Sequence, residues 1–212
     1  MTKISFFSRV LDLIAPRACA VCGRRLSITE EPLCATCNIA LPRTNCHFQP
    51  LDNEVAQLFW GRIPIEKCAA YFFYKPNSAS SYLIYKLKYF DRPDIGEQFG
   101  RLIAAEYATQ NFFDGITALL PVPLTKRRTI QRGYNQSLEI AHGVSAVTGI
   151  TILKDTIKRT SFVDSQTQKD IWERTKNVEN AFKLCVPEKI NNQHILLIDD
   201  IITTWATLTA VG

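Results

Sequence analysis

The sequence has no uninterrupted apolar run of about 18 residues, the length that a membrane-spanning helix requires. It also has no secretory signal, because Arg9 and Asp12 interrupt the apolar residues of the first fifteen positions. Those apolar residues follow a helical spacing, which favours packing on the rest of the chain; contact with a membrane surface is the alternative. We therefore expect a cytoplasmic protein without a membrane span.

The sequence also has little excess charge of either sign. Its net charge of +5 is spread over 212 residues, so it is compatible with phosphate-bearing ligands and with nucleic acid and does not choose between them. With 46% apolar and 21% charged residues, the composition excludes a disordered chain. This length suits one domain of moderate size with a small appendage.

Cysteine is scarce outside one short stretch, since five of the seven fall between Cys19 and Cys46. Two Cys-x-x-Cys pairs, Cys19 with Cys22 and Cys34 with Cys37, are separated by eleven residues. Four thiolates at this spacing can close a tetrahedral zinc site with Zn–S distances of about 2.3 Å. A four-cysteine site leaves no open position, so we expect structural zinc; two disulfides are the alternative, disfavoured without an export signal.

The middle of the chain alternates between strand-like and helix-like apolar patterns. Residues 51–65 show no clear periodicity and predict a linker. We expect strands over 67–74, 116–123 and 151–153, with a longer strand that reaches 158 as the alternative for the last. We expect helices over 78–90, 94–110 and from the basic stretch at 126 to about 147. The polar segment 161–176 has the character of a mobile loop.

The last eighteen residues carry the densest functional pattern. The apolar run from Ile195 to Ile198 predicts a strand buried on both faces, which is typical of a parallel sheet covered by helices. Asp199 and Asp200 follow at the carboxyl end of that strand, where open α/β sheets bind ligands. A hydroxyl-rich turn comes next and opens a helix: Thr203, Thr204, Trp205, Ala206 and Thr207.

This pattern suits a sugar phosphate. Adjacent carboxylates can accept hydrogen bonds from two vicinal ribose hydroxyls, while the threonine hydroxyls and the free N–H groups of a helix start can hold a phosphate. A core strand that ends in a capped helix is the plainer alternative, because Asp and Thr are common caps.

Two other stretches contain groups that can meet an anion. Lys126, Arg127, Arg128 and Arg132 follow a predicted strand, so they can lie at the same edge of the sheet as the two acids; a solvated basic loop is the alternative. The tyrosines and lysines of residues 78–90 can stack with and neutralise single-stranded nucleic acid, or can form an amphipathic helix with a solvated face.

The carboxyl-terminal stretch resembles the signature of type I phosphoribosyltransferases, in which an apolar strand and two acids lead to Thr-Thr-Gly-Ala-Thr or a variant. In that family the loop binds the ribose 5-phosphate part of phosphoribosyl pyrophosphate (PRPP). The resemblance implies an α/β fold with a parallel sheet flanked by helices, and it implies Mg²⁺ alongside PRPP.

The resemblance also assigns roles to residues. Asp199 and Asp200 are expected to bind the ribose hydroxyls. The 5-phosphate is expected to be held by Thr203, Thr204, Ala206 and Thr207. The pyrophosphate is expected to be held by Lys126, Arg127, Arg128 and Arg132. Trp205 departs from the signature, because it stands where the family has glycine. An indole there adds bulk and possible backbone strain at the phosphate.

The chain as a whole resembles the ComF family of competence-associated proteins. The matching pieces occur in one order: the two cysteine pairs, Leu87-Lys88-Tyr89, Pro121 to Leu124, Arg132 to Gln136, Ser165-Gln166 with Arg174 and Asn177, Ala181-Phe182, and Leu197 to Ile201. The resemblance implies an amino-terminal helix and zinc-ribbon module at 1–50, a phosphoribosyltransferase-like domain at 66–212, and a role in DNA uptake during natural competence.

Partners and activity follow from the same resemblance. We expect PRPP or a nucleotide-like ligand, with single-stranded DNA and a competence helicase as further partners. The chain is then either a phosphoribosyltransferase, or a nonenzymatic nucleotide sensor or single-stranded-DNA-binding adaptor. Related chains continue through the last helix into further sheet, so we also expect a carboxyl-terminal truncation.

Overall fold

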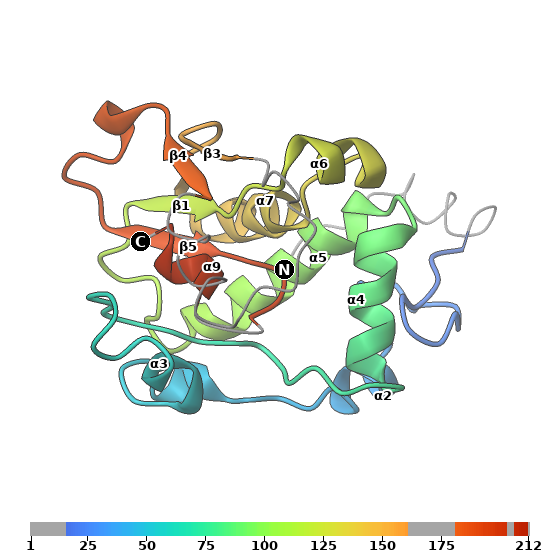
Figure 1. The fold of residues 1–212 in the computed structure, drawn as a ribbon. Helices are drawn as coiled ribbons and strands as arrows, with labels where there is room; N and C mark the ends of the chain where they lie inside the picture. Colours follow the sequence, from blue (N-terminus) through green and yellow to red (C-terminus); the bar gives the residue numbers. More distant parts are fainter. Residues whose placement is uncertain (1–15, 161–180, 203–205, 212) are drawn as a thin grey trace.

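The computed structural model describes residues 16–160, 181–202 and 206–211. The expected amino-terminal helix and the polar segment 161–176 lie outside these residues. None of the described helices is long and apolar enough to cross a membrane. The fold is α/β, with a parallel sheet and flanking helices (Figure 1).

The sheet has three described strands in the order β2-β1-β5. Strand β1 (Ala118–Pro121) pairs in parallel with β2 (Thr151–Ile152) on one side and with β5 (Ile195–Ile198) on the other. All four residues of β1 are buried, as expected for a central strand. In β5 Ile198 is buried and the other three residues are half-buried, with Leu196 packed against one core cluster and Leu197 against another. The parallel pairing predicted for β5 is confirmed, and its predicted burial is confirmed in part.

Two helices pack closely against each other beside the sheet. They are α5 (Pro93–Ala108) and α7 (Gln136–Thr148), and they meet at Gly100 and Gly143. A Cβ at either glycine would collide with a backbone carbonyl of the facing helix, so only glycine permits this approach. Helix α7 then contributes Ile140, Ala141 and Val144 to a core shared with the strands β1 and β5.

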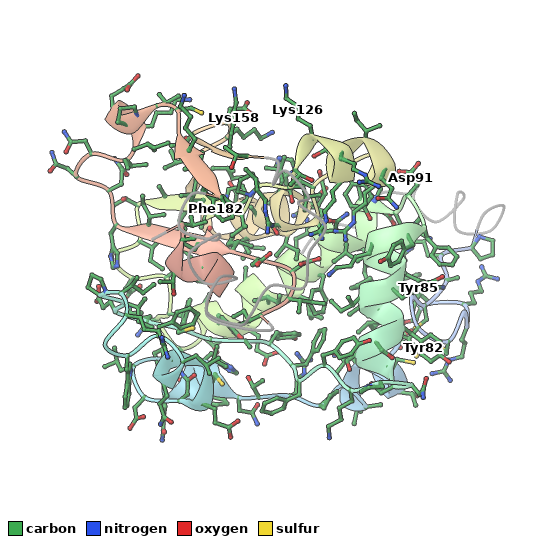
Figure 2. All side chains as sticks on the ribbon, viewed as in Figure 1. Tyr82, Tyr85, Asp91, Lys126, Lys158 and Phe182 are labelled. Carbon is green, nitrogen blue, oxygen red and sulfur yellow. The ribbon has the colours of Figure 1, made fainter. Side chains whose placement is uncertain are left out.

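Helix α4 (Ala79–Tyr89) confirms the helix predicted over 78–90. At its start the Ser78 N–H donates to the Ser81 hydroxyl at 3.0 Å, which satisfies a backbone group left free at the helix end. The aliphatic residues of α4 are buried, whereas its tyrosines are exposed; Figure 2 shows Tyr82 and Tyr85 along the helix.

The amino-terminal region lies along the lower side of the molecule in Figure 1. It contains α2 (Ala35–Ile39), the 3₁₀ helix η1 (Cys46–Phe48) and α3 (Glu54–Gln57). The buried residues between Cys19 and Leu41, among them Leu33, form one hydrophobic cluster with residues of α4 and α5. The cysteine-bearing loops therefore pack directly on the helices that flank the sheet.

Residues 67–74, predicted as a strand, form only an isolated bridge between Phe72 and Arg43. Their backbone hydrogen bonds go to the amino-terminal loops: the Phe73 N–H, for example, donates to the Pro42 carbonyl at 2.8 Å. The aromatic pattern reflects packing on α5 and the amino-terminal loops, and none of the described strands pairs with this segment. The strand prediction is therefore wrong.

The helix predicted from 126 to about 147 is two helices. Helix α6 (Lys126–Arg132) ends because Gly133 takes a left-handed φ of 79°. Helix α7 starts anew after Asn135, whose side chain accepts a hydrogen bond from the Ser137 N–H at 3.1 Å.

The remaining elements are short. Strand β3 (Ile157–Arg159) pairs antiparallel with β4 (Phe182–Leu184) in a second sheet, so the predicted strand at 151 ends before Lys158. The 3₁₀ helix η2 (Pro187–Lys189) precedes β5, and α9 (Ala206–Thr209) follows it.

Candidate functional site

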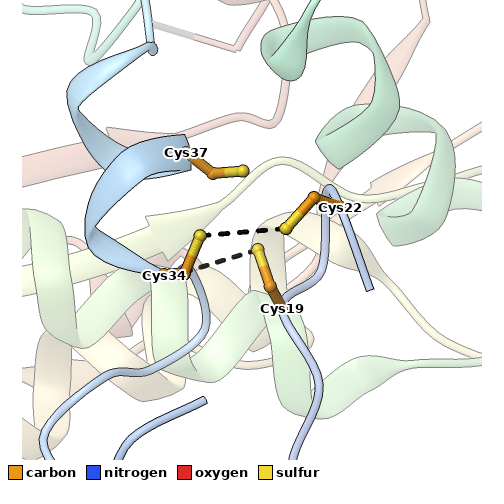
Figure 3. A group of neighbouring side chains, drawn as sticks. All are labelled: Cys19, Cys22, Cys34 and Cys37. Carbon is orange, nitrogen blue, oxygen red and sulfur yellow. Dashed lines mark hydrogen bonds between the residues drawn. The ribbon is translucent and has the colours of Figure 1, made fainter. Parts of the chain in front are cut away.

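Four thiol groups converge near the amino terminus (Figure 3). Cys19 and Cys22 lie on one loop, Cys34 and Cys37 lie at the start of α2, and all four sulfurs are within 4.8 Å of one another. Cys22 Sγ is 3.8 Å from Cys34 Sγ. A tetrahedron with metal–sulfur bonds of about 2.3 Å has edges of about 3.8 Å, so this separation fits a shared ion.

The surroundings of the thiols favour negative charge at Cys34. Hydrogen bonds from the Cys37 backbone N–H and from the Arg24 side chain lower the pKa of Cys34 to about 6. Burial and the other thiols raise the pKa of Cys37, and a bound cation would offset that rise. All seven cysteines are free thiols, so the alternative of two disulfides is not what the structure shows. The four cysteines can hold a structural metal ion.

The two predicted acids lie directly after β5 and are held from both neighbouring helices. Asp199 Oδ1 accepts hydrogen bonds from the Asp200 N–H at 2.8 Å and from the Ser137 hydroxyl of α7 at 3.2 Å. The Lys88 ammonium of α4 lies 2.9 Å from Asp200 Oδ2, with both side chains less than a fifth exposed. Both carboxylates are therefore fixed at the carboxyl edge of the sheet.

The electrostatics of this carboxylate pair are unusual for aspartate. Burial raises the pKa of Asp199 to about 6, and the adjacent Asp200 charge adds to the rise. Hydrogen bonds from the Asp200 backbone and Ser137, together with the charge of Lys88, act in the opposite direction. Asp199 is thus mainly ionised at pH 7 and takes up a proton as the pH falls through about 6.

Four residues separate the end of β1 from the start of the basic helix α6, which puts α6 at the same edge of the sheet as the acids. Lys126 and Arg127 are exposed, and Lys126 points outward (Figure 2). Burial lowers the pKa of Arg159, the charge of Arg128 lowers it further, and Asp199 raises it. Arg128 and Asp199 are therefore both within electrostatic reach of Arg159.

Arg132, at the end of α6, faces α4. Its Nη1 donates to Gln136 Oε1 at 2.7 Å, and its guanidinium carbon lies 5.9 Å from the centre of the Tyr89 ring. This side chain joins α6 to the exposed side of α4.

A groove of about 1130 Å³ runs along β5. Its lining is mostly apolar, and among its acidic residues Asp199 and Asp200 lie at the end of the strand. Among the residues that the structure describes, none of α6 lines the groove. The groove therefore gives access to the carboxylates, while the basic helix lies outside it.

The predicted phosphate loop falls largely outside the described part of the chain. Thr203, Thr204 and Trp205 lie outside it, and Ala206 and Thr207 are described only by the backbone that opens α9.

Three residues near the acids were not assigned a role from the sequence: Lys88, Ser137 and Arg159. Lys88 lies in Leu87-Lys88-Tyr89, and Ser137 directly follows the segment that ends at Gln136; both segments match the ComF family. These two matches could have identified Lys88 and Ser137 as candidate site residues. Arg159 follows no motif, because only the fold brings β3 near the acids.

Comparison with known proteins gives relatives over nearly the whole chain. DNA utilization protein YhgH of Escherichia coli O157:H7 is 28% identical over 197 residues, covering 92% of this chain and 82% of that protein. The protein of the same name from Salmonella typhimurium is 26% identical over 210 residues, covering 94% and 91%. Competence protein F of Haemophilus influenzae is 34% identical over 96 residues, covering 45% and 42%.

No model of a known family matches the chain. The similarity to DNA utilization proteins along the chain, and the higher identity to competence protein F over part of it, support a relationship of this protein to the ComF family.

Proposed function

We propose that this chain is a ComF-type protein that binds PRPP or a related ribose phosphate and serves DNA uptake in natural competence. The observation that carries the proposal is the carboxylate pair Asp199 and Asp200 after β5, held by Ser137 and Lys88 from two helices. Two fixed, adjacent acceptors suit the two vicinal hydroxyls of a ribose. The names of the relatives support the DNA-related part.

The ligand's phosphates would meet groups on either side of this pair. Thr203, Thr204 and Thr207, with Ala206 between them, would hold the 5-phosphate. Arg128 would meet the pyrophosphate, together with Lys126, Arg127 and Arg132, and Mg²⁺ would offset part of its charge. Arg159 adds a further positive group that responds to both Arg128 and Asp199.

Turnover at such a site is phosphoribosyl transfer. The bond between the anomeric carbon and pyrophosphate breaks, pyrophosphate leaves with the electron pair, and a nucleophile bonds to that carbon with inversion. Buried carboxylates stabilise the positive charge that develops on the sugar. A nonenzymatic sensor binds the same ligand and releases no pyrophosphate, so product release separates the two forms of the proposal.

The metal that we propose for the four cysteines is zinc, bound structurally. The sulfur spacing fits a closed tetrahedral site, and the cysteine loops pack on α4 and α5, so the metal would stabilise the side of the molecule that carries Lys88. Free thiols suit the reducing cytoplasm.

Isothermal titration calorimetry with PRPP and Mg²⁺ tests the proposal. The native chain should bind PRPP, and an Asp199→Asn/Asp200→Asn variant should lose at least about tenfold in affinity, because two charge-assisted hydrogen bonds are weakened. Asp114→Asn is the matched control, since Asp114 is exposed and precedes β1 at the opposite edge of the sheet. Equal affinity of the native chain and the double variant would refute the site.

A further inference from the structure

Helix α4 exposes an aromatic face. Tyr82, Tyr85 and Tyr89 are three and four residues apart, a spacing that puts them on one side of a helix, and each is 54–60% exposed. Phe90 continues this face at 53% exposure, with its ring centre 5.5 Å from that of Tyr85, and the Tyr85 and Tyr89 rings lie 5.1 Å apart. A contiguous group of exposed rings indicates a binding surface.

Positive charge lies beside these rings. Lys86 is on the same helix, and the Arg132 guanidinium carbon lies 5.9 Å from the Tyr89 ring centre. Arg132 comes from α6, in which no residue is buried and four of seven residues are basic. The acids at this end of α4 are Asp91, and Asp94 in an ion pair with Arg92, so the balance of charge stays positive.

We propose that this aromatic–basic surface, formed by Tyr82, Tyr85, Tyr89, Phe90, Lys86 and Arg132, binds single-stranded nucleic acid. Bases would stack on the tyrosine rings, and Lys86 and Arg132 would neutralise phosphates. Tyr82 and Tyr89 are about 10 Å apart along the helix axis, so the face can receive more than one base.

The composition of the face favours this occupant over two others. A duplex keeps its base faces stacked inside, so it offers phosphates but no ring to the tyrosines. A protein interface also uses exposed tyrosines, but lysine is depleted in interfaces, whereas Lys86 lies at helical spacing from both Tyr82 and Tyr89. Aromatic rings flanked by cations are the combination that a single strand recognises.

The inference rests on the DNA-related part of the proposed function, and the surface shares only Arg132 with the proposed ribose phosphate site. Helix α4 presents the tyrosines to solvent while Lys88 of the same helix contacts Asp200. Substitution of the tyrosines should therefore leave the carboxylate site intact.

Fluorescence anisotropy with a labelled oligothymidine strand and a duplex of equal length tests the surface. Each of Tyr82→Ala, Tyr85→Ala and Tyr89→Ala should weaken single-strand binding at least about fivefold, and the corresponding Phe variants should retain it, because stacking needs the ring and not the hydroxyl. Trp60→Ala is the matched control, because Trp60 is 53% exposed and follows α3, a helix that lies well apart from α4 in Figure 1.

Charge and ring character are tested separately. Lys86→Gln and Arg132→Gln should each reduce the slope of log affinity against log salt by about 0.7. The triple variant Tyr82→Leu/Tyr85→Leu/Tyr89→Leu keeps an apolar surface without aromatic rings, so it should lose single-strand binding. If this variant binds the single strand as tightly as the native chain does, the proposal that bases stack on the tyrosines is wrong. If the native chain prefers the duplex, the proposed ligand is wrong.

The same proteins titrated with PRPP separate this inference from the proposed function. A native chain that binds the oligonucleotide but not PRPP supports the surface and contradicts the ribose phosphate site. A native chain that binds PRPP but not the oligonucleotide overturns the surface alone.

Discussion

The Lys88 ammonium lies 2.9 Å from Asp200 Oδ2, and this ion pair joins α4 to the end of β5. The exposed fractions of the two side chains are 16% and 13%, so the pair is shielded from water on most sides. Asp200 is also next to the partly desolvated Asp199, whose charge repels its own. Lys88 is therefore the counter-charge that allows two acids to lie side by side at this edge of the sheet.

Removing that counter-charge should destabilise the fold. We expect Lys88→Met to lower the free energy of unfolding by about 1–3 kcal/mol, because Asp200 is left charged and shielded without a partner. Urea denaturation measures the change. Lys86→Met is the control on the same helix, and adding Asp200→Asn to Lys88→Met should recover most of the loss. Equal stability of the native chain and Lys88→Met would show that the pair contributes nothing.

Asp199 should make stability depend on pH. Its pKa is about 6 in the folded chain against a usual value of 3.8, so between these values the folded state binds more protons than the unfolded state. The contribution of this group to stability therefore falls as the pH rises from about 4 to 6, by up to roughly 3 kcal/mol, and is constant above.

The Asp199→Asn variant isolates this contribution. The difference in unfolding free energy between variant and native chain should grow in favour of the variant from pH 4 to 6 and then level off. PRPP affinity of the native chain should rise over the same range, as the carboxylate ionises. A stability difference that does not change with pH would contradict the raised pKa.

Charge reversal at Arg128 should weaken anionic ligands more than it weakens the fold. We expect Arg128→Glu to reduce affinity for PRPP and for pyrophosphate at least about tenfold, since one charge-assisted contact is replaced by repulsion. Lys189→Glu is the matched control, because Lys189 is exposed and precedes β5 at the opposite edge of the sheet. Calorimetry that shows equal losses for the two variants would indicate a general effect of net charge.

The cysteine cluster should contain one zinc ion per chain. Elemental analysis by mass spectrometry should find it in the native protein and not in Cys34→Ser, which should also lose thermal stability, because metal binding supplies folding free energy to the cysteine loops. Cys185→Ser, at the end of β4 and away from the cluster, should keep the metal. A native protein with no zinc and with paired thiols would support the disulfide alternative.

Features with a local sequence pattern were predictable. The cysteine spacing predicted the convergence of four sulfurs, the apolar run before Asp199 predicted a parallel strand, and the pattern of residues 78–90 predicted α4. In each case residues that are close together in the sequence determine the local structure. The same reasoning was wrong at residues 67–74, where the apolar pattern reports burial against α5 without a partner strand.

Features that depend on packing between distant segments were not predictable. The approach of Gly100 to Gly143 brings α5 against α7, and the contacts of Lys88 with Asp200 and of Ser137 with Asp199 each join residues far apart in the chain. None of these pairs has a fixed spacing in the sequence.

The central claim is that the segment after β5 binds ribose phosphate, and Trp205 offers the most direct test because it replaces the glycine of the signature. Relief of crowding at the phosphate should restore one or two charge-assisted hydrogen bonds, each about 1.5–3 kcal/mol, so Trp205→Gly should bind PRPP at least about tenfold more tightly than the native chain. Adding Thr204→Val, which removes one hydroxyl at nearly constant shape, should cancel the gain. The measurement is a calorimetric titration of the three proteins with PRPP and Mg²⁺; a gain in affinity with glycine that valine abolishes is the predicted result, and absence of PRPP binding by both the native and the glycine forms would contradict the claim.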